Sequence, residues 1–305
     1  LLNLIAASKS SLIKPEVLVR INPEVNVDAI LPATNKKGKF GVPLYGKTPD
    51  SAFELIQKIY LSQYLIFSGI HFHLGSQIND PDCYLETIDK LELFIFTIRK
   101  DLPDLQIKIL DIGGGIPVFY SEDVPSPTNF GRVVSEKINE FADSIGNNFT
   151  LIVESGRFLT AESCVLISKI VNSKSFIDKK LLIVDSGYHL LLDSALINHE
   201  YPIHLINDSK SFMESKVHIV GRLCDPLDVF NISDDKKFSS AHVKDLIVFH
   251  KVGAYAIVFN MPFHCQTKPA ILLRQLDQNI TVIRNAESID DLFKQEGGYL
   301  FDASS

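Results

Sequence analysis

Cysteines are few in this chain and lie far apart. Its 305 residues include four, at Cys83, Cys164, Cys224 and Cys265, and no CxxC pair occurs. This spacing predicts reduced thiols and no zinc site. Apolar runs are short, and none reaches the length that spans a membrane. The apolar start, residues 1–10, has no basic segment before it, so we interpret it as the end of a helix and not as a signal peptide.

Positive charge is also scarce. The chain has 30 Lys and Arg against 37 Asp and Glu, a formal net charge of -7, which gives no electrostatic support to a nucleic-acid-binding role. Hydrophobic residues make up 46% and charged residues 22%, the balance of a folded globular protein and not of a disordered one. The length suffices for two domains. Together these features favour a cytoplasmic enzyme.

The first half of the sequence alternates strands with helices. Helical spacing of apolar residues marks 51–65, 84–100 and 130–145, and β-rich runs occupy 17–25, 66–75, 105–115 and 150–158. Such alternation predicts parallel strands joined by helical crossovers. Only about four units are present, whereas a closed (β/α) barrel has about eight. We therefore expect an α/β fold, part of a (β/α)8 barrel, over residues 1–163.

The second half has a different pattern. Helical spacing fades near Ser163, and short β-rich runs separated by turn residues follow at 165–176, 180–187, 216–224, 244–259 and 270–285. This predicts an antiparallel β-domain, a sandwich or a barrel, over residues 164–305.

Polar residues recur where the strands of the first half end. Arg20, His73, the Gly113–Gly115 run and Glu154 share this position, and catalytic residues of a (β/α) barrel lie at the C-terminal ends of its strands. His71 and His73 share one face of a strand, and an isolated pair of this kind is more often two core histidines. A metal site is not favoured, because no third or fourth ligand is evident. The strand-end position favours a binding role for His73.

The other motifs are each open to a plainer interpretation. Each of three consecutive glycines costs ordering entropy and in return lets another group approach the backbone closely. A phosphate-binding nest is therefore favoured over a simple tight turn. They do not form GxGxxG, so a dinucleotide fold is not supported. Glu154 and Arg157 alone suggest a salt bridge, and Cys224-Asp225 alone suggests an ordinary turn. Tyr255 is expected in a strand as a packed aromatic.

Taken together and in order, nine segments carry a resemblance. They are VLVRINP (17–23), KFGV (39–42), HFHLGSQ (71–77), DIGGG (111–115), ESGR (154–157), VDSG (184–187), CDPLD (224–228), GAY (253–255) and RNAESIDDLF (284–293). In this order they resemble the alanine-racemase-like, fold type III pyridoxal-phosphate-dependent decarboxylases of basic amino acids. That group includes diaminopimelate, ornithine and lysine decarboxylases, and the resemblance covers nearly the whole chain. It implies a barrel that binds pyridoxal 5′-phosphate, followed by the β-domain.

The resemblance also implies roles for single residues. His73 would stack on the cofactor ring, and Glu154 would pair with the pyridine nitrogen, because a protonated ring is the stronger electron sink. Phosphate would be bound by Ser76, Gly113, Gly114, Gly115, Gly156, Arg157 and Tyr255. Arg20 is assigned to substrate binding. Cys224 would help to protonate the reaction intermediate and Asp225 would hold the distal amine of the substrate, both in the active site of a neighbouring subunit, which implies a homodimer with shared sites.

Several departures from the family concern the substrate. Ser155 stands where the family has Pro, and Asp193 and Ile197 replace the Arg and Tyr of diaminopimelate decarboxylases. Phe263-His264 replaces their Tyr-Asn. Cys224-Asp225 matches the ornithine enzymes, whereas HFHLGSQ is closer to bacterial diaminopimelate enzymes. Asp225 and the absence of an Arg at Asp193 predict a substrate with a distal amine, in preference to diaminopimelate.

The largest departure concerns the lysine that forms the family's Schiff base. No segment resembles YAxKAN, and Lys36, Lys37 and Lys39 belong to the KFGV region. We expect that lysine in a segment preceding this chain. Two hypotheses follow: a decarboxylase whose N-terminal part is absent from the sequence, or a non-catalytic homologue that binds partners. The enzyme is favoured by the joint presence of His73, Glu154, Arg157, Cys224, Asp225 and Tyr255.

Overall fold

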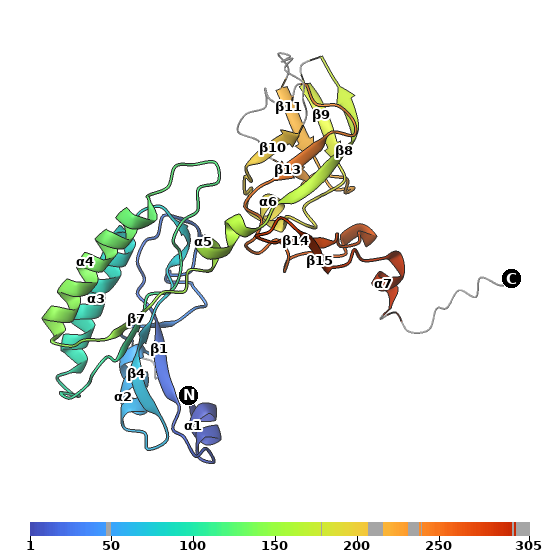
Figure 1. Cartoon of the computed structure of the whole chain (residues 1–305). Helices are drawn as coiled ribbons and strands as arrows, with labels where there is room; N and C mark the ends of the chain where they lie inside the picture. The colour runs from blue at the N-terminus through green and yellow to red at the C-terminus, as the bar shows by residue number, and fades with distance from the viewer. Residues whose placement is uncertain are drawn as a thin grey trace. The chain divides into compact units, whose positions relative to one another are not determined.

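The computed structural model forms two compact units, Leu1–Leu159 and Thr160–Ser305 (Figure 1). It describes residues 1–46, 50–177, 179–206, 216–230, 238, 240–294 and 296. No helix in these ranges is long and apolar enough to cross a membrane. The assignment of a cofactor-binding part to residues 1–163 and a β-domain to 164–305 stays a prediction at those boundaries.

The first unit is built on a parallel sheet in the order β3-β1-β4-β6-β7. Its strands are β1 (Glu16–Asn22), β3 (Val42–Pro43), β4 (Ile66–His71), β6 (Ile109–Asp111) and β7 (Thr150–Ile152). The helices are α1 (Leu2–Ser8), α2 (Ala52–Tyr60), α3 (Asp82–Ile98), α4 (Pro127–Ile145) and α5 (Gly156–Thr160). A separate antiparallel pair joins β2 (Ala29–Pro32) to β5 (Gly75–Ile78). The predicted partial (β/α) barrel is confirmed.

Local sequence explains where the main helices begin and end. The Ser51 side chain accepts a hydrogen bond from Glu54 N at the start of α2, and the Ser126 side chain accepts one from Asn129 N at the start of α4. Helix α4 has Pro127 in its first turn and ends at Gly146, whose φ of 59° is the left-handed conformation that glycine adopts without strain.

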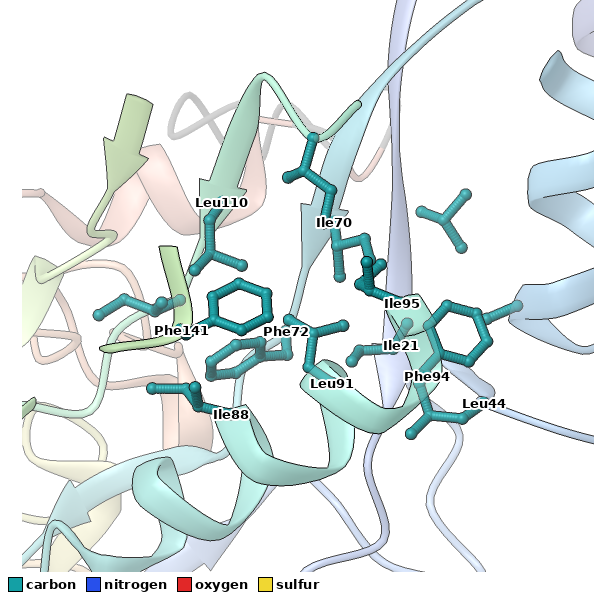
Figure 2. Close-up of a cluster of buried hydrophobic side chains, with 14 of the residues drawn as sticks. Ile21, Leu44, Ile70, Phe72, Ile88, Leu91, Phe94, Ile95, Leu110 and Phe141 are labelled. Carbon is teal, nitrogen blue, oxygen red and sulfur yellow. The ribbon is translucent and has the colours of Figure 1, made fainter. Parts of the chain in front are cut away.

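The core of this unit lies between the sheet and its helices. Figure 2 shows Ile70 and Phe72 gathered with side chains of α3 such as Leu91. Side chains alternate along a strand, so the burial of Ile70 and Phe72 against the helices turns His71 and His73 to the opposite face. The hydrophobic pattern of β4 therefore positions both histidines.

Gly69 in β4 provides a test of this packing. A Cβ added there would lie 1.8 Å from the backbone oxygen of Ile109 in β6, so backbone would have to move. We expect Gly69→Ala to lower the free energy of unfolding by about 3 kcal/mol, the upper end for an overpacked core. The matched control is Gly131→Ala in α4, where a Cβ meets no atom within 4 Å. That change should raise stability by about 0.5–1 kcal/mol. Equal urea midpoints for the two variants would contradict the packing described.

The second unit is a β-domain with a six-stranded sheet in the order β10-β13-β8-β9-β11-β12. The strands are β8 (Leu166–Ser175), β9 (Lys179–Val184), β10 (Ile203–Ile206), β11 (Lys216–Val220), β12 (Val229–Phe230) and β13 (Leu246–Phe249). All pairs are antiparallel except β9 with β11. A hairpin of β14 (Ile271–Arg274) and β15 (Ile280–Arg284) follows. This unit also contains two short helices, α6 (Leu192–Leu196) and α7 (Ile289–Phe293).

One predicted strand of this unit is shorter than expected. The run 244–259 leaves the sheet after Phe249, and the prediction that Tyr255 lies in a strand is wrong. Lys251 and Tyr255 have φ of 61° and 65°, which no strand residue adopts. Gly253 N donates to Ala161 O, and a Cβ on Gly253 would lie 1.9 Å from Thr160 O. The chain therefore turns to pack against the segment that follows α5.

Candidate active site

The register of the parallel sheet brings the predicted strand-end residues together. Arg20 of β1 pairs with His71 of β4, and His71 pairs with Asp111 of β6. Two residues further along, Glu154 N donates to Gly113 O over 2.8 Å. The carboxyl ends of β1, β4, β6 and β7 thus present one continuous set of polar groups, as chemistry at strand ends requires.

His73 is held in one tautomer. Its Nδ1 accepts a hydrogen bond of 3.0 Å from Gly114 N, so the proton of the neutral ring is on Nε2. Burial and the nearby charge of Arg20 lower the pKa of His73 below its usual value. The side chain is therefore a neutral, oriented aromatic ring, which suits stacking on a second ring.

The glycine run serves close backbone packing. Gly113 has a φ of 69°, and its N–H donates to Asp111 Oδ1 over 2.9 Å. A Cβ on Gly114 would lie 2.4 Å from Glu154 O. Gly115 has a φ of 122°, and among the described residues its N–H has no hydrogen-bond partner. Gly115 N is thus ready to donate, whereas a phosphate would compete with Asp111 and His73 for the other two N–H groups.

Cationic and hydroxyl groups meet beside Gly115. The buried Arg157 side chain donates from Nε to Ser76 Oγ over 3.2 Å and from Nη1 to Tyr120 Oη over 3.4 Å. A Cβ on Gly115 would lie 2.9 Å from the oxygen of Gly75, the neighbour of Ser76. Ser76, Gly115 and Arg157 therefore form a group of donors suited to an anion. Gly156 begins α5 next to Arg157.

Acidic groups lie close to His71. Glu154 is 51% exposed, and its Oε2 lies 3.5 Å from His71 Nε2. Nitrogen or oxygen atoms of His71, Asp111 and Glu154 all lie within 4.8 Å of one another. Sequence reasoning found no further ligand-type group near His71, and the strand register supplies two. Such a trio can face a cation, either a metal ion or a protonated ring nitrogen.

The Cys224-Asp225 loop belongs to the second unit and is anchored by Asp228. The buried Asp228 carboxylate accepts hydrogen bonds from Tyr188 N over 2.7 Å and from Leu223 N over 2.8 Å. Burial raises the pKa of Asp228, while these backbone donors oppose the rise. A Cβ on Gly221 would lie 2.1 Å from the same carboxylate, so glycine is required there. Asp228 therefore fixes the course of the loop.

Asp225 itself is oriented by two donors. Tyr188 Oη donates to Asp225 Oδ2 over 3.1 Å, and Leu227 N donates to Asp225 Oδ1 over 2.8 Å. Cys224 is an exposed free thiol. The loop therefore presents a fixed carboxylate next to an accessible sulfur.

The structure also shows the surroundings of three further residues that the sequence singled out. Arg20 lies over the ring of Phe40, 4.7 Å from its centroid. Tyr255 is 44% exposed and stacks on Phe259. Asp193 is buried in α6. Their assigned roles in substrate and phosphate binding stay predictions.

Four residues that sequence reasoning did not single out support the two sites. Tyr84 Oη donates to Gly114 O over 2.7 Å and so fixes the glycine run. Asp111 holds Gly113, Asp228 anchors its loop, and Tyr188 orients Asp225. The only signal for Asp111 and Asp228 was their place inside the DIGGG and CDPLD motifs.

His189 makes the second unit sensitive to acid. Burial, and then the charge of Arg222, lower the pKa of His189 to about 4 from 6.5. Between pH 6.5 and about pH 4, His189 binds a proton in the unfolded chain but not in the folded one. The free energy of unfolding is therefore highest above about pH 6.5 and decreases as the pH falls through this range. Between about pH 7.5 and pH 4, we expect the unfolding free energy of His189→Gln to fall by about 3 kcal/mol less than that of the wild type. Urea unfolding at both pH values measures it, with exposed His218→Gln as control. An unchanged pH dependence would contradict the assignment.

Comparison with known proteins identifies the family. Residues 2–161 match the family model described as the pyridoxal binding domain of pyridoxal-dependent decarboxylases. The chain belongs to this family. It is 31% identical over 296 residues to diaminopimelate decarboxylase of Helicobacter pylori, covering 93% of this chain and 67% of that protein. A probable chloroplastic diaminopimelate decarboxylase of Oryza sativa is 26% identical, covering 96% of this chain and 58% of the relative.

Solved structures of the family share the fold. The crystal structure of the Helicobacter pylori diaminopimelate decarboxylase complexed with L-lysine aligns with a TM-score of 0.82 and 27% identity, over 97% of this chain and 71% of that one. The Methanocaldococcus jannaschii relative is 26% identical in sequence over 92% of this chain and 62% of its own length. A third or more of the length of these curated relatives thus has no counterpart in the chain.

The cofactor of this pyridoxal-dependent decarboxylase family is pyridoxal phosphate, and the residues present fit it. Donors suited to a phosphate gather at Ser76, Gly115 and Arg157, and a carboxylate, that of Glu154, is held near His71 at the same strand ends as the neutral ring of His73. The strand ends therefore offer donors for a dianion and a carboxylate for a ring nitrogen that takes a proton.

Proposed function

We propose that the protein decarboxylates a basic amino acid, or an amine-bearing amino acid derivative, with pyridoxal phosphate as cofactor. The observation that carries the proposal is the strand register that joins His73, Gly115 and Glu154 at one edge of the sheet, beside the Ser76–Arg157 pair. The bound cofactor supplies an electron sink for the carbanion left when CO2 departs. Support comes also from the family and from the relatives named diaminopimelate decarboxylase.

The residues of the first unit act on the cofactor by binding and orientation. Ser76 and Arg157 hold the phosphate, with Gly113, Gly114, Gly115 and Gly156 as further proposed contacts. His73 stacks as a neutral ring, which avoids repulsion between two cations. Glu154 keeps the ring nitrogen protonated, because an adjacent carboxylate favours the charged form.

The second unit provides groups for the substrate. Asp225, oriented by Tyr188, holds the distal ammonium group, and Cys224 returns a proton to the reacting carbon. A carboxylate at that position repels a second carboxylate, which disfavours diaminopimelate. We propose that these groups act in a partner's active site, within a homodimer. No observation on the described residues or the relatives supports the alternative of a non-catalytic homologue.

Release of CO2 by the full-length protein tests the function. With pyridoxal phosphate present, we expect CO2 from lysine, ornithine or an amine-bearing derivative, and a lower kcat/KM for meso-diaminopimelate. A preference for diaminopimelate would refute the substrate class. If no amino acid of this panel yields CO2 although the cofactor is bound, the decarboxylase assignment is wrong.

A further inference from the structure

His71 lies between two carboxylates. Its Nε2 is 3.5 Å from Glu154 Oε2, and Asp111 is its direct neighbour in the strand register. The histidine side chain is only 17% exposed, and within the described part of the chain its Nε2 has no hydrogen-bond partner. This imidazole nitrogen is therefore buried near Glu154 Oε2 without a hydrogen bond to it, and a small rotation of either side chain would form the bond.

The two carboxylates differ in how firmly they are held. Asp111 is buried and accepts a hydrogen bond from Gly113 N. Glu154 is half exposed, and among the described residues its only ion-pair partner is His71. Since like charges at this spacing repel, Glu154 without the imidazole gains by turning into solvent, and it also regains side-chain entropy.

We propose that His71 is a positioning residue that holds the Glu154 carboxylate beside Asp111 and turned toward the cofactor's ring nitrogen. The inference rests on the proposed function, which assigns that nitrogen to Glu154. The charged and titratable groups facing the site are Arg20, His71, His73, Asp111 and Glu154. With His71 neutral or protonated, the trio of His71, Asp111 and Glu154 keeps a net negative charge. The trio therefore favours a protonated ring nitrogen in both cases.

A probe without an aldehyde separates this role from catalysis. The compound 4-deoxypyridoxine 5′-phosphate carries the phosphate and the ring nitrogen, so its binding requires no lysine. Its ultraviolet absorbance reports protonation of the ring nitrogen. In the wild-type protein we expect the bound ring to keep its proton to higher pH than the free probe. His71→Phe should weaken probe binding about tenfold and lower that pH by about one unit.

Three further variants distinguish positioning from a general structural role. His71→Gln places an amide donor near the position of Nε2 and should restore most of the affinity, whereas His71→Asn, whose amide lies near Nδ1, should not. Asp111→Asn keeps an acceptor for Gly113 N and removes one negative charge. Added to His71→Phe, it should restore much of the probe's affinity, because Glu154 is no longer repelled.

Each outcome decides one question. If the wild-type protein does not bind the probe, the proposed cofactor site fails, whatever His71 does. If His71→Phe binds the probe like the wild type, with the same ring protonation, the positioning role is wrong. If Zn²⁺ alone binds to wild-type protein, displaces the probe and is lost in His71→Phe, the trio is a metal site and the inference is overturned.

Discussion

Replacing Glu154 with Gln should abolish most of the activity while leaving the cofactor bound. The amide has the size of the carboxylate but no charge, so it cannot stabilise a protonated ring nitrogen. Loss of one such electrostatic partner lowers kcat by about 10²- to 10³-fold. The phosphate contacts at Ser76 and Arg157 remain, so affinity for pyridoxal phosphate should fall by about tenfold at most. Single-turnover CO2 release and cofactor titration of the full-length protein measure the two quantities.

A surface glutamate provides the control for this substitution. Glu136 on α4 is 60% exposed and pairs with Arg132 one turn away. Glu136→Gln should leave kcat and affinity unchanged, since exposed pairs of this type contribute little. If Glu154→Gln retained normal turnover, Glu154 would have no part in keeping the ring nitrogen protonated.

Replacing Asp225 with Ala should produce the second large effect, on the substrate. The change removes the partner of the substrate's distal ammonium group and leaves that charge uncompensated in a partly dry site. We expect kcat/KM for lysine or ornithine to fall by about a hundredfold, mainly through a higher KM. A substrate analogue with an uncharged side chain should lose nothing. Steady-state CO2 release gives both values.

Two further variants separate the charge of Asp225 from the order of its loop. Asp225→Asn keeps acceptors for Leu227 N and Tyr188 Oη but removes the charge, so it should be nearly as impaired as Asp225→Ala. Tyr188→Phe removes one oriented hydrogen bond and should raise KM only severalfold. If Asp225→Asn behaved like wild type, the role of Asp225 would be to order the loop, and the assignment to the distal amine would be wrong.

The positions of the site residues could be predicted because they follow from simple periodicity. Alternation in β4 places Ile70 and Phe72 in the core, which puts His71 and His73 on the other face. Parallel strands with helical crossovers end at one edge of the sheet, so His73, Gly113 and Glu154 are expected there together.

The contacts within the site could not be predicted, because they depend on register and on backbone conformation. Only the pairing of His71 with Asp111 shows that two carboxylates flank the imidazole. The sequence likewise suggests that three glycine N–H groups are free, whereas two of them donate to Asp111 and His73. In the second unit, a run of β-forming residues predicts a strand through Tyr255, and packing of Gly253 against Thr160 overrides that preference.

Titration of the full-length protein with pyridoxal phosphate tests the central claim most directly. We predict a single saturable site in the wild-type protein, seen as a change in cofactor absorbance. The double variant Ser76→Ala/Arg157→Gln should lose at least about a hundredfold in affinity, because charged hydrogen bonds to the phosphate are removed. Arg132→Gln, which changes an exposed arginine, should bind normally, and unfolding midpoints confirm that all three proteins are folded. Absence of saturable binding to the wild type, or equal binding by the double variant, would contradict the account.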